Sequence, residues 1–484
     1  MSRTVLPRAT PETQGVDSDA IAAFVREANS ADLGLHSLMI LRHGQVIAEG
    51  WWDPYTAEQP HMMFSVSKSL TATAIGIAEA EGLLSVDDPI LSFFPTYATE
   101  AIRQNVADVK VRHLLSMATG HAVDTMEIMR ALPNLDWVSV FLNVPIEYPP
   151  GTHFLYNSGA SFVLAAIVAS RTGQSAQDYL SSRLFEPIGM ETPPWETNNR
   201  GINLGASGVR LRTEDLARIG QLYLQRGLWN GTQVLTEKWI EAATAAQVSN
   251  GSDPEDDWSQ GYGFQIWRSK HNSYRMDGRY GQFSFVLPDQ DTVVAITAGT
   301  SLSRDIPELL WRHLLPGIHP EALPAADSST EELGRLLSAQ EVRVPDFVPA
   351  PAWEATVPHV DMKVPFNTLH VTSVRLEFLG AETRLVTVND EGTVESVPAG
   401  AAEWLPGATA LWPHEEMHRV STASRAGWID EHVFEVHQQC TDTPFRRIWR
   451  FEFDPATRTP TVIVRLDNGF WVERTEVLAG EPIA

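Results

Sequence analysis

A serine and a lysine, three residues apart, stand at the start of a helical pattern of apolar residues. Ser65-Val66-Ser67-Lys68 is followed by Leu70, Ala74, Ile77 and Ala78, which recur at the spacing of one helical face. An i, i+3 spacing brings the serine and the lysine together on the helix surface, where an amine can take a hydroxyl proton. The pattern therefore predicts a nucleophilic serine paired with a basic lysine.

The position of Ser65 in the first helical turn adds a second chemical possibility. Backbone N–H groups in the first turn have no partner within the helix, so the N–H of Ser65 is available to stabilise an oxyanion. Lys68 can act as a base only when it is neutral, which burial and a nearby cation achieve. The alternative is that Ser65 or Ser67 is an ordinary N-cap, although the helix dipole then disfavours the cation of Lys68.

Several further stretches make the pattern more specific. Residues 64–70, 81–89, 111–120 and 149–158 together resemble the serine β-lactamase and penicillin-binding protein superfamily. They are most similar to its class C β-lactamase-like branch of esterases and amide hydrolases. The resemblance extends over residues 10–315, and the motifs occur in the family's order. It implies a β-lactamase/transpeptidase-like α/β (α+β) fold, with an antiparallel sheet flanked by helices and a helical subdomain.

The resemblance places the second family motif at Tyr156-Asn157-Ser158. It implies that Tyr156 shares proton transfer with Lys68, and that Asn157 and Ser158 bind substrate. Ser158 stands where asparagine is usual, so this position offers fewer hydrogen-bond donors. A phenol with a pKa of about 10 beside an ammonium can shift toward phenolate. Without the other motifs, Tyr156 would be read as a packing tyrosine.

The third motif is placed at Met276-Asp277-Gly278, with Arg279-Tyr280-Gly281 as the competing alignment. On the first alignment the backbone N–H of Arg279 is the second oxyanion donor, and Asp277 and Gly278 bind substrate. Lactamases carry a lysine in this motif that pairs with a carboxylate of the drug, whereas Asp277 would repel an anion. Arg279 can replace the missing lysine as a partner for an anion, because a planar guanidinium can donate two parallel hydrogen bonds to a carboxylate. The substitution favours neutral esters or amides over penicillins.

The elements that must position these residues divide the chain into two parts. Residues 37–52 have the pattern of a hairpin, residues 85–260 are mainly helical, and residues 281–287 and 293–297 are strand-like. Strands at both ends of a helical middle predict one mixed sheet that receives strands from both ends. We therefore expect residues 1–318 to form the hydrolase domain.

A second domain is expected after a proline-rich linker. Residues 319–352 contain five prolines and a short acidic stretch, which is typical of a connecting segment. Residues 353–484 alternate polar and apolar side chains with a period of two. This pattern predicts a separate, antiparallel β sandwich or barrel, whose function the sequence leaves open.

Composition limits the partners and the compartment. The formal net charge of −25 disfavours nucleic acid and anionic membranes as partners. Cys440 is the single cysteine, the first residues do not resemble a signal peptide, and no apolar run is long enough to span a membrane. A cytoplasmic protein is expected. The oligomeric state is not predicted.

One further sequence pattern is typical of metalloenzymes. His414-Glu415-Glu416-Met417-His418 matches a zinc motif, but that motif requires a helix, and here it follows a proline within strand-like sequence. No cofactor or metal is therefore expected. The histidines near the motifs are interpreted as structural, namely His61, His113, His121 and His153.

The sequence thus predicts a serine hydrolase that forms an acyl-enzyme on Ser65 with small esters or amides. Three alternatives stay open. A transacylase would use the same site, a D-aminopeptidase or β-lactamase would differ in substrate, and a binding protein would retain the residues without turnover.

Overall fold

The catalytic fold is built around one antiparallel sheet. The computed structural model describes residues 5–365, 367, 369–411, 419–467, 474–478 and 481–482. Within these, six strands lie in the order β2 (Gln45–Trp51), β1 (Leu35–Arg42), β10 (Thr292–Ala298), β9 (Gln282–Leu287), β8 (Tyr274–Gly278) and β7 (Trp267–Arg268). Every pairing along this order is antiparallel. The sheet receives strands from both ends of the domain and is antiparallel, as the resemblance implied. The mixed sheet expected from the strand pattern is not found, because β10 runs antiparallel to β1.

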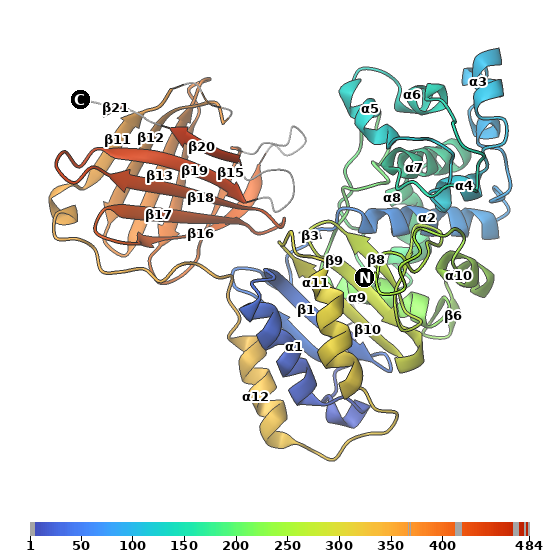
Figure 1. The fold of residues 1–484 in the computed structure, drawn as a ribbon, viewed down its shortest axis with the longest axis horizontal. Helices are drawn as coiled ribbons and strands as arrows, with labels where there is room; N and C mark the ends of the chain where they lie inside the picture. Colours follow the sequence, from blue (N-terminus) through green and yellow to red (C-terminus); the bar gives the residue numbers. More distant parts are fainter. Residues whose placement is uncertain are drawn as a thin grey trace.

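Strand β1 is buried on both faces, and its alternating side chains enter two separate cores. Leu38 and Ile40 belong to the core beneath α1 (Ser18–Ser30) and α11 (Asp305–Leu309). Met39 and Leu41 belong to the core shared with α2 (Val66–Ala80) and α9 (Thr213–Leu224). Because successive side chains of a strand point to opposite faces, a single apolar run anchors both helical layers (Figure 1).

A helical subdomain lies beside α2, as the resemblance implied. Its helices are α3 (Glu100–Asn105), α4 (Val111–Leu115), α5 (Thr125–Ala131), α6 (Trp137–Asn143), α7 (Ser158–Thr172), α8 (Ala176–Leu180) and α10 (Glu237–Thr244). Helix α7 is central, since it contacts α2, α4, α5 and α6. Short strand pairs complete this part, β3 (His61–Met62) with β4 (Arg210–Leu211) and β5 (Leu228–Trp229) with β6 (Thr232–Gln233). This packing brings the segment before α7 next to the start of α2.

The segment expected to be a linker contains a helix. Helix α12 (Asp327–Ser338) packs against α1 and β2 and buries Leu333 and Leu337 in the catalytic domain. Its amphipathic spacing explains the packing, because these two residues are one turn apart on one face. The chain becomes a connector only after α12.

The C-terminal region is a separate β domain, as predicted. In the described part of this region, eleven strands form a single curled sheet, a half-barrel around its own apolar core (Figure 1). The strands are β11 (His359–Lys363), β12 (Val371–Leu379), β13 (Glu382–Asn389), β14 (Val394–Gly400), β15 (Leu405–Thr409), β16 (Val420–Trp428), β17 (Val433–Cys440), β18 (Arg446–Phe453), β19 (Pro460–Asp467), β20 (Arg474–Leu478) and β21 (Glu481–Pro482). The zinc-like motif at residues 414–418 lies outside the described residues. Of the helices described, none is long and apolar enough to cross a bilayer.

Candidate active site

Ser65 and Lys68 meet at the N-terminus of α2, as their spacing predicts. The Nζ atom of Lys68 lies 3.0 Å from Ser65 Oγ and donates to the carbonyl oxygen of Ala206 at 2.9 Å. Both acceptors are neutral, and Lys68 is only 2% exposed. The lysine is therefore held in place by a hydroxyl and a backbone carbonyl.

Ser65 occupies the N-cap position of α2, but its side chain caps no backbone N–H. The N–H groups of Val66 and Ser67 instead donate to the carbonyl oxygens of Met63 and Phe64. Among the residues that the structure describes, the N–H of Ser65 has no acceptor. The ordinary N-cap alternative therefore does not describe Ser65, whose hydroxyl faces Lys68 and whose amide is left for another acceptor.

Burial makes Lys68 a base near neutral pH. Desolvation of the amine is the largest cause, and it lowers the pKa of Lys68 to about 7. Arg130 lowers this pKa further, while Asp124 and Asp277 oppose the shift. A large fraction of the lysine is consequently neutral at pH 7, with a lone pair available to take a proton.

Tyr156 comes from distant sequence to complete the cluster. The Ser65 side chain acts on the Tyr156 hydroxyl and partly lowers its pKa, and the ring centroid of Tyr156 lies 5.0 Å from Lys68 Nζ. Trp267 stacks on the ring with a centroid distance of 5.5 Å, and Tyr262 packs edge-on at 6.3 Å. These rings exclude water, and burial raises the pKa of Tyr156 well above its ordinary value. The expected shift toward phenolate is wrong, because desolvation outweighs any attraction to a lysine that is itself largely neutral.

Buried hydroxyls on α2 fix the loops that surround Lys68. Ser67 Oγ accepts from the N–H of Val209, and Thr71 Oγ1 donates to the carbonyl oxygen of Gly205 at 2.8 Å. These two bonds flank Ala206, whose carbonyl receives the lysine. The polar residues of this apolar helix thus set the position of the acceptor that holds the base.

Asn157 does not face the catalytic cluster. It is fully buried at the N-cap of α7, where its Oδ1 accepts from Gly159 N, Thr125 N and Thr125 Oγ1. Its amide oxygen joins α7 to α5, and a contact between Asn157 and substrate stays a prediction. Ser158 is half-buried, and its backbone N–H donates to Asp124 Oδ1 at 2.9 Å.

The third motif lies against the segment that carries the nucleophile. A Cβ atom at Gly278 would stand 2.3 Å from the carbonyl oxygen of Met63, so only glycine permits this approach. Asp277, the preceding residue, acts electrostatically on both Lys68 and Tyr156. This close approach favours Met276-Asp277-Gly278 over the competing alignment as the third motif.

Asp277 is held by a buried arginine that the sequence did not single out. Arg275 Nε donates to Asp277 Oδ2 at 2.9 Å, and its Nη1 donates to Asp257 Oδ2 at 3.0 Å and to Ser269 Oγ. Trp258 covers the guanidinium at 4.1 Å. Burial raises the pKa of Asp277, although Arg275 opposes the shift. The carboxylate is thus part of an internal ion-pair network and is 15% exposed.

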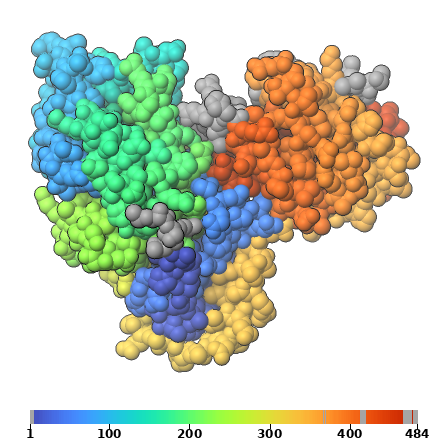
Figure 2. Space-filling model, turned by 180° about the vertical axis from the view of Figure 1, so that it is seen from behind, coloured from blue at the N-terminus to red at the C-terminus, as the bar shows by residue number. Residues whose placement is uncertain are grey.

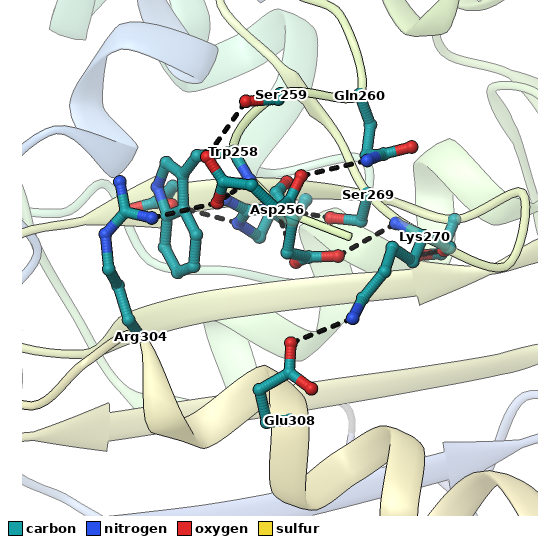
Figure 3. Close-up of polar contacts among 12 residues, drawn as sticks. Asp256, Trp258, Ser259, Gln260, Ser269, Lys270, Arg304 and Glu308 are labelled. Carbon is teal, nitrogen blue, oxygen red and sulfur yellow. Dashed lines mark hydrogen bonds and ion pairs between the residues drawn. The ribbon is translucent and has the colours of Figure 1, made fainter. Parts of the chain in front are cut away.

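The loop before β7 closes this network from outside (Figure 3). Asp256 accepts from Ser259 Oγ and pairs with Arg304 at the start of α11, and Lys270 pairs with Glu308 of the same helix. These exposed contacts tie the 256–270 region to α11. They keep Trp258 over Arg275 and so stabilise the strand that carries Asp277.

Sequence reasoning missed Ala206, Asp124 and Arg275. Ala206 acts through its backbone, and its only signal is the glycine-rich stretch Gly205-Ala206-Ser207-Gly208. Asp124 precedes α5 as an N-cap, which a sequence can indicate, but its bond to Ser158 depends on tertiary packing. The ion pairs of Arg275 join residues 257 and 277, and no local pattern marks them.

The described residues contain no cluster of three or more histidine, cysteine, aspartate or glutamate side chains arranged to hold a metal ion. Two of the nearby histidines have clear structural partners. His113 Nδ1 accepts from the N–H of Lys110 at the start of α4, and His121 lies 2.8 Å from Thr119 Oγ1. These residues support the helical subdomain, in line with their structural interpretation.

Comparison with known families agrees with this geometry. The sequence model of the family described as Beta-lactamase matches residues 25–313, more than half of the chain. The chain belongs to the beta-lactamase family. This family consists of serine hydrolases, and the matched region includes Ser65, Lys68 and Tyr156.

Two curated relatives and one crystal structure illustrate the likeness. The 6-aminohexanoate-dimer hydrolase of Paenarthrobacter ureafaciens is 24% identical over 311 residues, 59% of this chain and 78% of the relative. Penicillin-binding protein 4 of Amycolatopsis lactamdurans is 28% identical over 345 residues, 62% and 85% of the two chains. A penicillin-binding protein homologue from Caulobacter crescentus has a TM-score of 0.50 at 16% identity, covering 64% of this chain and all of its own. This last likeness concerns the fold of the beta-lactamase family alone.

Proposed function

We propose that this beta-lactamase family member is a serine hydrolase that cleaves small esters or amides through an acyl-enzyme on Ser65. The observation that carries the proposal is the pairing of Ser65 Oγ with a buried lysine whose pKa is about 7. A serine hydroxyl is a weak nucleophile until an adjacent base removes its proton. Lys68 is in position to do this without any further group.

In the first step the Ser65 oxygen attacks the substrate carbonyl carbon. The hydroxyl proton passes to the neutral amine of Lys68, a carbon–oxygen bond forms, and the carbonyl electron pair moves to the carbonyl oxygen. The backbone N–H groups of Ser65 and Arg279 are the proposed donors to this oxyanion. The preorganised amides stabilise charge that is absent from the ground state, so they act on the transition state.

In the second step the intermediate expels the alcohol or amine. The proton held by Lys68 returns to the leaving group, and the neutral phenol of Tyr156, whose ring lies 5.0 Å from Lys68 Nζ, is the proposed relay. Water then attacks the acyl carbon while Lys68 accepts its proton. The bond between the acyl carbon and Ser65 Oγ breaks, the acid leaves, and the proton on Lys68 returns to Ser65 Oγ. Because Tyr156 is a phenol rather than a phenolate at neutral pH, its proposed role is to donate and pass on protons.

The charges around the site support a neutral substrate. Asp124 and Asp277 raise the pKa of Lys68, whereas Arg130 lowers it. Arg130 also lowers the pKa of Arg279. The two carboxylates and two guanidiniums balance, and Asp277 is already paired with Arg275. A relative in the family is named for hydrolysis of a 6-aminohexanoate dimer. We therefore place neutral esters and amides ahead of anionic lactams.

Covalent labelling tests the proposed nucleophile. A fluorophosphonate should label the folded protein stoichiometrically at Ser65, located by peptide mass spectrometry, and labelling should vanish in Ser65→Ala. Ser92→Ala, which alters an exposed serine, is the matched control and should label normally. Labelling at another residue, or none in the folded wild type, would contradict the proposal.

A substrate panel tests the preference. Short-chain p-nitrophenyl esters and uncharged amides should be turned over at higher kcat/KM than nitrocefin. A faster reaction with nitrocefin than with any short ester would overturn the preference while leaving Ser65 as the nucleophile. Product analysis with added alcohol or amine separates hydrolysis from acyl transfer.

A further inference from the structure

A hairpin of the β domain reaches the catalytic domain beside the nucleophile. Residues 441–445 connect β17 to β18, and we call this segment the docking hairpin. The N–H of Met62 donates to the carbonyl oxygen of Asp442 at 2.9 Å, and Tyr55 Oη donates to that of Thr443 at 2.8 Å. Figures 1 and 2 show the β domain resting against this part of the catalytic domain. The contact thus joins the two domains through backbone groups near Ser65.

The docking hairpin is internally hydrogen-bonded and closely fitted. Thr443 N donates to the carbonyl oxygen of Cys440, and Phe445 N donates to Thr443 Oγ1, which closes a tight turn. A Cβ atom at Gly299, just beyond β10, would stand 2.6 Å from the carbonyl oxygen of Pro444. This approach excludes any larger residue at position 299. The hairpin is therefore packed at the backbone level, with Thr443 and Phe445 buried.

Phe445 contacts the two residues that flank the proposed oxyanion donors. Its ring lies edge-to-face with Phe64 at a centroid distance of 6.0 Å and with Tyr280 at 5.4 Å, while Phe64 and Tyr280 meet at 5.2 Å. Phe64 directly precedes Ser65, and Tyr280 directly follows Arg279. The aromatic triad of Phe64, Tyr280 and Phe445 thus links both donors to the β domain.

Both catalytic-domain members of the triad have strained backbones. The φ angles of Phe64 and Tyr280 are 46° and 66°, in the left-handed region that costs a non-glycine residue about 1–2 kcal/mol. Such conformations persist only when their surroundings hold them. Three mutual ring contacts supply such a restraint, each contributing about 0.5–1.5 kcal/mol beyond burial.

We infer that Phe445 is a positioning residue for the active site, and that the docking hairpin keeps the N–H groups of Ser65 and Arg279 aimed at one oxyanion. This inference rests on the proposed function. It assigns the β domain a part in catalysis, since the domain supplies the third ring of the triad. Loss of that ring leaves Phe64 and Tyr280 free to relax, and their neighbouring amides move with them. A small misplacement of such donors is enough to slow a reaction substantially.

The experiment compares two leucine substitutions in the full chain. Phe445→Leu removes the ring that contacts the catalytic domain. Phe451→Leu removes a ring on β18 that lies in the core of the β domain, and it controls for destabilisation of that domain. Circular dichroism first fixes a temperature at which all variants are folded. The measurements are kcat and KM for a p-nitrophenyl ester, and the Ki of phenylboronic acid, whose adduct with the serine mimics the tetrahedral intermediate.

We expect Phe445→Leu to lower kcat about tenfold and to weaken the boronate by a similar factor, with KM changed less than threefold. Phe451→Leu should stay within twofold of wild type in kcat, KM and Ki. Phe445→Ala should lower kcat and weaken the boronate more than Phe445→Leu does. Equal effects of Phe445→Leu and Phe451→Leu, or wild-type kinetics for Phe445→Leu, would overturn the inference. Ser65→Ala separates the two proposals, because activity that survives this substitution rejects the proposed function itself.

Discussion

Lys68 and Arg275 are both basic side chains buried in the catalytic domain, 2% and 0% exposed, yet their surroundings differ in kind. Lys68 contacts a hydroxyl and a backbone carbonyl. Arg275 contacts two carboxylates and lies under an indole ring. Burial away from any contacting carboxylate lowers the pKa of Lys68 to about 7, whereas the guanidinium of Arg275 lies between two carboxylates.

The difference explains how two buried basic groups serve opposite purposes within one site. Lys68 gains reactivity because Asp124 and Asp277 offset only part of the cost of burying its charge. Arg275 is compensated on two sides, so it fixes Asp277 and the end of β8. The guanidinium also resists deprotonation in any environment, which an amine does not. Matched methionine substitutions at the two positions should therefore have contrasting effects.

The largest expected effect is on turnover. Lys68→Met should lower kcat by about 10²–10⁴, because the base that activates Ser65 is removed. Ser65→Ala should lower it by at least as much. The exposed lysine of α10 provides a control, and Lys238→Met should leave kcat unchanged. Steady-state hydrolysis of a p-nitrophenyl ester measures all three, and a Lys68→Met protein with more than a tenth of wild-type activity would exclude the lysine as base.

Lys68→Met should not destabilise the fold, in contrast to the loss of stability expected for Arg275→Met. The pKa of Lys68 is about 7 in the folded protein against 10.5 ordinarily, so the unfolded chain binds more protons between these values. Stability therefore rises with pH through this window, and the buried amine is a net cost at pH 7. At pH 7 the Lys68→Met variant should have a Tm equal to or higher than that of the wild type. It should also lack the rise of Tm with pH that the lysine causes above pH 7.

The next largest expected effect is on the free energy of unfolding when Arg275 is replaced. Arg275→Met leaves Asp257 and Asp277 buried without their cation, which should cost about 3–5 kcal/mol in the free energy of unfolding. Urea unfolding monitored by tryptophan fluorescence measures this change. Arg304→Met removes only an exposed partner of Asp256 and should cost less than about 1 kcal/mol. If Arg275→Met proved as stable as wild type, the ion-pair network would not hold β8.

The sequence predicted the residues that local motifs mark, but not the roles that depend on tertiary packing. Ser65, Lys68 and Tyr156 were predicted because their motifs are local and occur in the family's order, and the structure brings them together. The structural role of Asn157 was not predicted, because only packing shows that its carboxamide joins α7 to α5. The direction of the pKa shift at Tyr156 was misjudged, since the rings that desolvate it come from residues 262 and 267.

The prediction of the fold was limited in the same way, to features that leave a local pattern in the sequence. Periodicity predicted the strands of both domains and the helix after Ser65, because burial on one face or both leaves a local pattern. It did not reveal that the catalytic sheet is wholly antiparallel or that α12 packs within the expected linker. The alternation in the C-terminal region predicted an antiparallel β domain, but the curvature of its single sheet depends on pairing between distant strands.

A moderate effect is expected in the pH profile. Because Lys68 must be neutral to accept a proton, kcat/KM should rise with pH below about 7 and level off above it. The slope should be about tenfold per pH unit on the acidic limb. Tyr156 should add no alkaline limb near neutrality, since burial holds its pKa above the ordinary value. A limb centred below pH 5 would show that Lys68 is not the titrating base.

The smallest effect tests the electrostatic part of the lysine's surroundings without touching the cluster. Arg130 on α5 is exposed, and its charge lowers the pKa of Lys68. Removing this charge in Arg130→Gln should raise that pKa and move the acidic limb upward by about 0.3–0.7 pH units. Screening by salt should shrink the shift. Arg103→Gln, an exposed arginine on α3, should leave the limb in place. A shift of equal size in both variants would mean that net charge alone moves the profile, whereas a shift confined to Arg130→Gln shows that Lys68 responds to a particular neighbour, as a base without a paired anion should.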